Sequence, residues 1–257
     1  MYHHLAPPSE RPEEPGVITP ERFESHLQML KAQGYRFISA GQFADYMERR
    51  LSLPGRSVLI TFDDGYKSNY TLGFPLLRKY GAPALIFAVM NFFDTDGKGA
   101  WSPHLVQSEA QEMLDSGLID FGGHSYDGHG TVPTGPDGKQ PEPWLTGRAW
   151  LKAQGRAETD DEYRQRIHAD LAHAAERLRA IGVKDEALHF ALPNGASTPA
   201  ELAELKSLGY RYIYSIDGSR LNDPYMLTIY RIDAGGPHAS AGWLKDRLDQ
   251  LYGPSPR

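Results

Sequence analysis

The sequence predicts a single α/β domain built on a mainly parallel sheet or barrel. The chain has 257 residues, a length common among one-domain α/β barrels. Its hydrophobic fraction of 40% and charged fraction of 23% are those of a globular chain that buries a core. Short apolar runs of strand length alternate with helical patterns, and glycines close many of the turns between them. No linker or repeat divides the chain, so residues 1–257 are expected to form one domain.

The first part of the chain predicts two helices and two strands after an irregular start. Residues 6–20 are rich in proline and polar groups, which is typical of a surface segment. Thr19 and Pro20 then supply an N-cap and a proline at the first helical position, and Gly34 supplies a stop. The expected elements are a helix over 21–33, a strand over 37–38, a helix over 41–50 and a buried strand over 57–62.

The rest of the chain continues this alternation. Apolar residues recur either in continuous runs, as in buried parallel strands, or at helical spacing. The segment 130–145 contains several prolines and glycines and is expected to be a loop. The expected elements are helices over 70–80, 105–116, 159–181, 199–208 and 241–251, and strands over 84–89, 119–123, 188–192 and 212–216.

Composition excludes several classes of function. The 27 Lys and Arg residues against 33 Asp and Glu give a net charge of −6, which disfavours a nucleic-acid partner. The chain has no Cys, which excludes disulfides, thiolate nucleophiles and zinc–thiolate sites. No apolar run approaches the roughly 18 residues that span a bilayer. Any metal ion must therefore be bound by His and carboxylates.

The first residues bear on the cellular compartment. Met1, Tyr2, His3 and His4 lack the basic and apolar regions of a signal peptide, which taken literally predicts a cytoplasmic protein. The alternative is a chain from which a signal and an anchor have been removed, because a histidine pair is an unusual place for a domain to begin.

Two adjacent aspartates follow the predicted buried strand over 57–62. Asp63, Asp64 and Gly65 stand where α/β folds place their active sites. Both carboxylates can reach one cleft, because the chain turns at the end of the strand. The alternative interpretation is an ordinary turn, in which Asp and Gly are common.

A histidine cluster follows the predicted strand over 119–123. His124 and His129 lie five residues apart in a segment that contains three glycines, so a loop or strand end must bring them together. Two imidazoles and one carboxylate form a facial set on a divalent ion and leave positions for water and substrate. The alternative is a pair of ordinary core or surface histidines. Because both clusters follow strands, we expect them to meet at one edge of the sheet.

Paired aspartates beside such a set indicate metal-assisted hydrolysis of an amide or ester. One carboxylate binds the ion, and the other accepts a proton from water. The ion lowers the pKa of water and polarises a carbonyl group. Two His and one Asp suit zinc, nickel, cobalt or iron, so these residues do not select the ion.

The motifs resemble those of the NodB-homology polysaccharide deacetylases, carbohydrate esterase family 4. Residues 61–66 (TFDDGY) are similar to the TFDDG motif of that family. The second family motif is commonly His-Ser/Thr-x-x-His, whereas here Gly stands at 128 and the second His at 129. This departure resembles the branch that deacetylates the biofilm polymer poly-β-1,6-N-acetyl-D-glucosamine, of the PgaB and IcaB type. Other segments that resemble this branch are 2–4, 18–20, 158–167 and 190–195.

The resemblance implies a fold, an activity and a set of roles. The fold would be a distorted (β/α)7 barrel, and the activity metal-dependent N-deacetylation of a polysaccharide in the periplasm or at the cell surface, by a monomer. Asp64, His124 and His129 would bind one divalent ion, with zinc expected first. Asp63 would be the general base. In this branch a histidine after an N-terminal Tyr enters the active site, which makes His3 the expected acid. Substrate-binding residues are expected at Tyr66, Pro193, Asn194 and Trp144.

Several of these residues have a second interpretation. Trp144 either stacks on a sugar ring or packs down its own loop. Arg231 either orients the catalytic carboxylate or forms a structural ion pair. His3 either reaches the site or belongs to a disordered terminus. His238 stands in a context that does not match the Leu-x-His motif, whose histidine is the usual general acid of the family.

Two rival functions remain. One is a deacetylase of chitin oligomers or peptidoglycan. The other, from a different class, is a carbohydrate-binding module that retains the barrel without turnover, which the missing Leu-x-His motif favours. Asp63 argues against a module, because binding alone does not require a free base beside a metal ligand.

Overall fold

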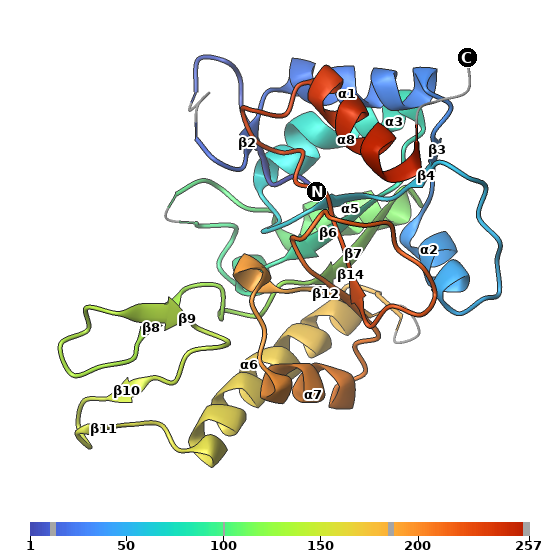
Figure 1. Ribbon diagram of the computed structural model, residues 1–257. Helices are drawn as coiled ribbons and strands as arrows, with labels where there is room; N and C mark the ends of the chain where they lie inside the picture. The colour runs from blue at the N-terminus through green and yellow to red at the C-terminus, as the bar shows by residue number, and fades with distance from the viewer. Residues whose placement is uncertain (11–13, 100, 185–187, 254–257) are drawn as a thin grey trace.

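The core of the fold is a six-stranded parallel sheet (Figure 1). The computed structural model describes residues 1–10, 14–99, 101–184 and 188–253. Neighbouring strands of this sheet follow one another along the chain, which is the topology of a sheet that curls in one direction. In spatial order the strands are β14 (Thr228–Ile229), β13 (Tyr212–Tyr214), β12 (His189–Ala191), β7 (Ile119–Gly123), β6 (Ala84–Ala88) and β5 (Ile60–Phe62).

The first residues of the chain lie between the two edges of this sheet. Tyr2 pairs in parallel with Phe62 in β5. On the other side, the N–H of Ala234, beyond β14, donates to the carbonyl of Met1 at 3.0 Å. The sheet is therefore a half-barrel whose open side is bridged by this short segment. The expected α/β barrel of the deacetylase type is confirmed in this distorted form.

Helices cover the outside of the half-barrel (Figure 1). Helix α1 packs against α8, and α6 packs against α7. Short polar side chains cap two of them: Thr19 accepts from the N–H of Arg22, as the sequence predicts, and Thr159 forms a capping box with Glu162. The helices are α1 (Pro20–Ala32), α2 (Ala40–Met47), α3 (Phe74–Tyr80), α4 (Asn91–Asp94), α5 (Gln107–Asp115), α6 (Asp160–Ala180), α7 (Pro199–Ser207) and α8 (Ala241–Tyr252).

Phenylalanine side chains from four adjacent strands of the sheet pack into the hydrophobic core. Phe62, Phe87, Phe121 and Phe190 are all fully buried. Each contributes roughly 1.5–3 kcal/mol through removal of its surface from water. These strands match the continuous apolar runs of the sequence, and their packing holds the carboxyl edge of the sheet in place.

The segment 130–145, expected to be a loop, contains a β-hairpin instead. Strand β8 (Thr131–Pro133) pairs antiparallel with β9 (Pro141–Pro143). The N–H of Trp144 donates to the carbonyl of Gly130, and hydrogen-bonded pairs alternate along such a ladder. All three prolines of the two strands therefore stand at positions whose N–H would point away from the partner strand. The prediction was wrong because proline is compatible with a strand at these positions.

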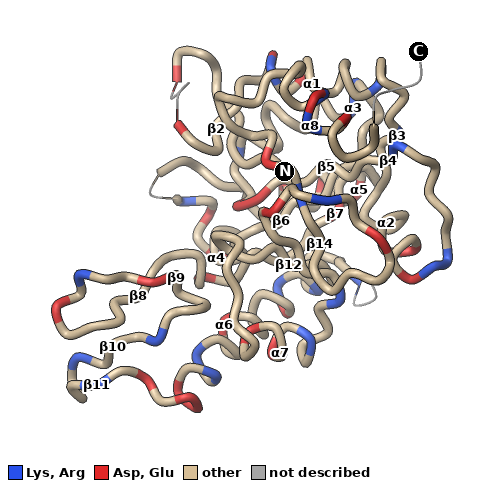
Figure 2. Tube along the Cα trace, viewed as in Figure 1, with Lys and Arg blue, Asp and Glu red and all other residues tan. Residues whose placement is uncertain are grey.

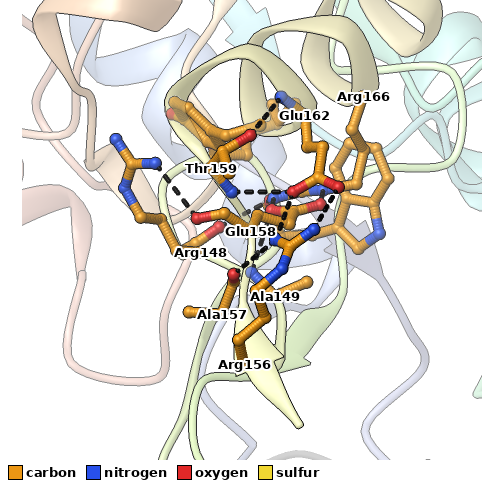
Figure 3. Close-up of polar contacts among 12 residues, drawn as sticks. Arg148, Ala149, Arg156, Ala157, Glu158, Thr159, Glu162 and Arg166 are labelled. Atoms are coloured by element: carbon orange, nitrogen blue, oxygen red, sulfur yellow. Dashed lines mark hydrogen bonds and ion pairs between the residues drawn. The ribbon is translucent and has the colours of Figure 1, made fainter. Parts of the chain in front are cut away.

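Two further strands extend the hairpin into an arm, defined here as residues 130–157. Strand β10 (Trp150–Leu151) pairs with β11 (Arg156–Ala157). Ion pairs attach the arm to the start of α6 (Figure 3). Arg156 binds both carboxylate oxygens of Glu162, at 2.6 and 2.8 Å. Glu158 binds Arg166 at 2.7 and 2.9 Å.

Smaller differences from the predicted elements occur elsewhere. The helix predicted over 70–80 begins as a π-helical turn, η1 (Asn69–Gly73), and continues as α3. Within the segment expected to be irregular, β2 (Val17–Ile18) pairs with β1 (His4–Leu5). The strand predicted over 57–62 divides into β4 (Ser57–Val58) and β5, and β4 pairs with β3 (Arg36–Phe37).

Charges of both signs are interspersed over the fold. Figure 2 shows Lys and Arg side by side with Asp and Glu in the arm and along the helices. None of the helices among the described residues has both the length and the apolar character that crossing a membrane requires.

Candidate metal centre

Two strand ends bring the predicted metal ligands together. Asp64 follows β5, and His124 and His129 follow β7, with β6 between them in the sheet. The carboxyl ends of these parallel strands lie at one edge. Asp64 adopts a left-handed backbone conformation with φ of 68°, which turns the chain at the end of β5. Ser125 has φ of 86° and turns the chain after His124.

The three side chains present their donor atoms to one point. Asp64 Oδ1 lies 3.4 Å from His124 Nε2 and 3.2 Å from His129 Nε2. One donor atom from each residue lies within 4.8 Å of the others. Donors bound to one tetrahedral zinc at 2.0–2.1 Å are separated by roughly 3.4 Å. The observed spacing therefore fits a divalent ion of this size.

The hydrogen bonding of His124 supports this fit. Its Nδ1 lies 2.8 Å from the carbonyl oxygen of Ala191, which can only accept, so Nδ1 carries a proton. The neutral ring then has its free lone pair on Nε2, which faces Asp64 Oδ1. That oxygen is buried and has no hydrogen-bond partner among the described residues. In the neutral form of the ring, His124 Nε2 and Asp64 Oδ1 both offer lone pairs, and a divalent metal ion between them would accept both.

A buried arginine holds the second aspartate. Arg231 donates to Asp63 Oδ1 at 2.6 Å and to Oδ2 at 2.8 Å. Its Nε donates to the carbonyl of Ser215 at 2.9 Å, and its guanidinium lies over the ring of Phe87. This two-point pairing fixes the plane of the Asp63 carboxylate. Each oxygen retains a lone pair that the arginine does not use.

The charges of the two aspartates follow from their neighbours. Burial alone would raise the pKa of Asp63, but Arg231 lowers it below its ordinary value. Burial likewise opposes ionisation of Asp64, while His124 and His129 hold its pKa well below the ordinary value. Burial would lower the pKa of His124, but Asp64 and Asp63 raise it. Both carboxylates are thus charged at neutral pH.

His3 lies beside this centre in a hydrogen-bonded segment. It follows Tyr2, which pairs with β5, and its carbonyl accepts from Asn69 Nδ2 at 2.8 Å. The N–H of Asp63 donates to the carbonyl of Tyr2 at 2.9 Å, so His3 is the next residue along the chain from a backbone partner of Asp63. The Nδ1 atom of His3 is buried without a hydrogen-bond partner among the described residues. His4 Nδ1 is hydrogen-bonded to Ser68 Oγ at 2.8 Å, a contact within the fold.

The residues predicted to bind substrate lie in different surroundings. Tyr66 is half-buried, two residues beyond Asp64, and its ring packs against His104. Pro193 is buried and Asn194 exposed in the turn after β12, with Asn194 at φ of 57°. Trp144 lies in the arm, where the guanidinium of Arg166 stacks on its ring at 4.3 Å.

An aromatic wall beside Asp64 was not predicted. Trp101 is 39% exposed and packs edge-on against Tyr66 and His4. His104 stacks on Phe92 at 3.6 Å, and burial lowers its pKa to about 4, so the ring is neutral at physiological pH. No spacing in the sequence connects these residues with Asp64, because the fold alone brings the segment 101–104 to Tyr66.

A buried carboxylate on α6 was also missed. Asp170 accepts hydrogen bonds from the backbone N–H groups of Tyr126 at 2.9 Å and Asp127 at 2.8 Å. These donors belong to the loop that connects His124 with His129. The sequence contains a signal for it, because Asp170 stands three residues after Ile167 on the apolar face of α6.

Together these features define a class of protein: a parallel α/β half-barrel with three side chains at its carboxyl edge that could hold a metal ion. Comparison with known proteins identifies the family. A model of the family described as polysaccharide deacetylase matches residues 50–213. The chain belongs to this polysaccharide deacetylase family.

Curated relatives have more specific names. A poly-β-1,6-N-acetyl-D-glucosamine N-deacetylase of Escherichia coli K12 is 30% identical over 212 residues, which are 79% of this chain and 31% of the relative. A Staphylococcus aureus protein with the same name is 24% identical over 236 residues, 88% of this chain and 71% of the relative. The chain thus matches about a third of the length of the first relative.

Solved structures share the fold. A de-N-acetylase from Aggregatibacter actinomycetemcomitans has a TM-score of 0.86 at 23% identity and covers 96% of this chain and 97% of its own. The deacetylase domain of BpsB from Bordetella bronchiseptica has a TM-score of 0.74 at 26% identity, with coverage of 90% and 93%.

Proposed function

We propose that this chain is a metal-dependent N-deacetylase of β-linked N-acetylglucosamine polymers, with poly-β-1,6-N-acetyl-D-glucosamine as the preferred substrate. One observation carries the proposal: lone pairs of Asp64, His124 and His129 converge beside Asp63, whose charge is fixed by Arg231. This arrangement combines a cation site with a base that does not bind the cation. The names of the curated relatives support the choice of polymer.

A divalent ion held by the three ligands would supply positive charge that acidifies water and polarises the acetyl carbonyl. Asp63 accepts a proton from the attacking water, whose oxygen bonds to the acetyl carbon. The C–N bond breaks, and the amine nitrogen takes a proton from the imidazolium of His3. The products are acetate and a free amine. Exchange with solvent returns the Asp63 proton and protonates His3 again.

Arg231 keeps Asp63 suitable for this role. Without a cation beside it, a carboxylate this deeply buried would be protonated and unable to act as a base. The arginine is itself held by the carbonyl of Ser215, so the base is fixed in orientation as well as in charge. Zinc is the expected ion, with nickel, cobalt and iron as alternatives. The proposed substrate places the site outside the cytoplasm.

Acetate release from three substrates tests the proposal. The metal-free protein is supplied with zinc, nickel, cobalt or iron and assayed on the β-1,6 polymer, chitin oligomers and peptidoglycan. We expect the β-1,6 polymer to be deacetylated fastest. Asp63→Asn is expected to lower kcat by about 10²–10⁴, because a positioned base contributes on this scale. Its affinity for the ion, measured by calorimetry, should remain close to that of the parent.

Several outcomes would contradict the proposal. Binding of the polymer without acetate release, with each metal supplied, would support the carbohydrate-binding module. Faster release from chitin oligomers or peptidoglycan would overturn the substrate assignment. Equal rates for Asp63→Asn and the parent would remove Asp63 from the role of base.

A further inference from the structure

We propose that Asp170 is a positioning residue: its carboxylate clamps the loop 125–128 and thereby sets the position of the metal ligand His129. The inference rests on the proposed role of His129 as a ligand. It concerns a residue of α6 that is outside the ligand set and distant from it in sequence.

The first observation is the hydrogen bonding of this carboxylate. Asp170 Oδ1 accepts from the N–H of Tyr126 at 2.9 Å, and Oδ2 accepts from the N–H of Asp127 at 2.8 Å. The N–H of Gly128 lies close enough to favour the charged form. Both oxygens are thus used by consecutive backbone groups of one loop. Such a cradle fixes the loop in one conformation, because each buried N–H would otherwise lose its partner.

The second observation is the burial of this contact. Asp170 is 7% exposed and stands on the face of α6 that otherwise presents Ile167 and Leu171 to the core. A carboxylate at such a position is costly unless it is hydrogen-bonded. Among the described residues no cation forms an ion pair with Asp170, so backbone N–H groups offset this cost. The stable arrangement therefore requires the loop to remain in place.

The third observation is the close packing on Gly128. A Cβ atom at this residue would lie 2.8 Å from Cε3 of Trp144 and 3.2 Å from Oδ1 of Asp170. The Trp144 ring is held in turn by Arg166, whose Nη1 donates to the Trp144 carbonyl at 2.6 Å. The loop is therefore confined between the arm on one side and Asp170 on the other. Helix α6 supports both restraints, through Arg166, which holds Trp144, and through Asp170.

These contacts explain how two histidines five residues apart share one ion. His124 is fixed by β7 and by its bond to Ala191, whereas His129 is partly exposed and follows the loop. Its imidazole reaches Asp64 only if residues 125–128 keep their conformation. The clamp supplies this restraint before a metal ion arrives, so less conformational freedom is lost on binding.

The test measures metal affinity in two pairs of variants. Asp170→Asn keeps the shape but replaces one acceptor oxygen with an NH2 group. Leu178→Ala, on the same helix about 12 Å away along its axis, controls for loss of core packing. Gly128→Ala disturbs the loop from within. Gly130→Ala is its matched control, because a Cβ there has no atom within 4 Å. Zinc affinity is measured by competition with a chelator, and folding by thermal unfolding of the metal-free proteins.

We expect Asp170→Asn and Gly128→Ala to weaken zinc binding about 10- to 100-fold, the scale on which groups that orient ligands act. The amides of Tyr126 and Asp127 should exchange faster in Asp170→Asn, and acetate release should recover as zinc is raised. Leu178→Ala should melt earlier but bind zinc like the parent, as should Gly130→Ala.

Three results distinguish the possible failures. If the parent binds zinc and Asp170→Asn binds it equally well, Asp170 is purely structural and the inference fails. If Asp170→Asn does not fold, parental zinc affinity in Gly128→Ala overturns the clamp. If the parent itself binds no divalent ion, the proposed function fails first.

Discussion

Two fully buried carboxylates, one at the candidate metal centre and one in α7, have pKa values shifted in opposite directions. Asp63 is 2% exposed and Glu201 is 0% exposed. Burial alone would raise the pKa of Asp63, but Arg231 lowers it below the ordinary value. Burial raises the pKa of Glu201 to about 7, and neither of its oxygens has a hydrogen-bond partner among the described residues.

The difference shows that the partner, and not the depth of burial, sets the charge. Asp63 faces a guanidinium and remains ionised. Glu201 forms no ion pair within the part of the chain that the structure describes, and it is protonated more readily. Asp170 lies between them: burial raises its pKa, while backbone N–H groups oppose the rise. The ionised state of Asp63 therefore depends on Arg231.

Replacing Arg231 with Met should raise the pKa of Asp63, as burial raises that of Glu201. The change leaves a buried carboxylate without its cation, so we expect a loss of about 3–5 kcal/mol in the free energy of unfolding at pH 7. The pKa of Asp63 should rise, and acetate release should shift to higher pH. Urea unfolding and a pH–rate profile measure the two effects.

The double variant Asp63→Leu with Arg231→Met is the control. Removing both partners of a buried pair is often neutral, so stability should recover while activity stays absent. Parental stability in the single variant would show that the pair contributes little to the fold.

Replacing Glu201 with Gln tests the unpartnered carboxylate. The folded pKa of about 7 lies above the ordinary value of 4.5, so the folded state holds its proton more tightly between these values. Parental stability should therefore fall as pH rises from about 4.5 to about 7 and then level off. At 1.36 kcal/mol for each pKa unit, the variant should gain up to about 3 kcal/mol relative to the parent over this range.

Urea unfolding at pH 5 and pH 8 measures this gain. Glu176→Gln, an exposed position on α6, is the control and should show no pH-dependent difference. A constant difference between parent and Glu201→Gln at both pH values would contradict the comparison.

An exposed pair should have the smallest effect. Arg156 and Glu162 are bound through two contacts, like Arg231 and Asp63, but their side chains are 43% and 34% exposed. Water and salt screen such pairs. Arg156→Gln should leave the melting temperature at physiological salt and the rate of acetate release unchanged. A loss comparable with that of Arg231→Met would show that burial does not separate the two pairs.

The strands of the sheet were predictable because they are buried on both faces. Continuous apolar runs predicted β6 and β12 within a residue or two, and Thr19 and Gly34 predicted the ends of α1. The hairpin in the arm was missed, since its prolines stand where no N–H is needed. The division between β4 and β5 depends on the pairing of β4 with β3, which no local pattern specifies.

The site was predictable where its residues adjoin strand ends. Asp64, His124 and His129 lie together as the sequence indicates, and Arg231 forms a buried ion pair with Asp63. Their roles in catalysis stay predictions, as does that of His3. The helical spacing of α6 marks Asp170 as a residue of the apolar face, but not its role, because its partners are backbone groups 43 and 44 residues away.

The prolines of the arm have a consequence for association between chains. In β9 the residues whose N–H would point outward are Pro141 and Pro143, so the outer edge of this strand offers no donor to a further strand. Pro133 removes another donor from the outer edge of β8. The arm extends from the body of the fold into solvent (Figure 1). Such an exposed ribbon is ordinarily a template for edge-to-edge aggregation, and these prolines block that templating.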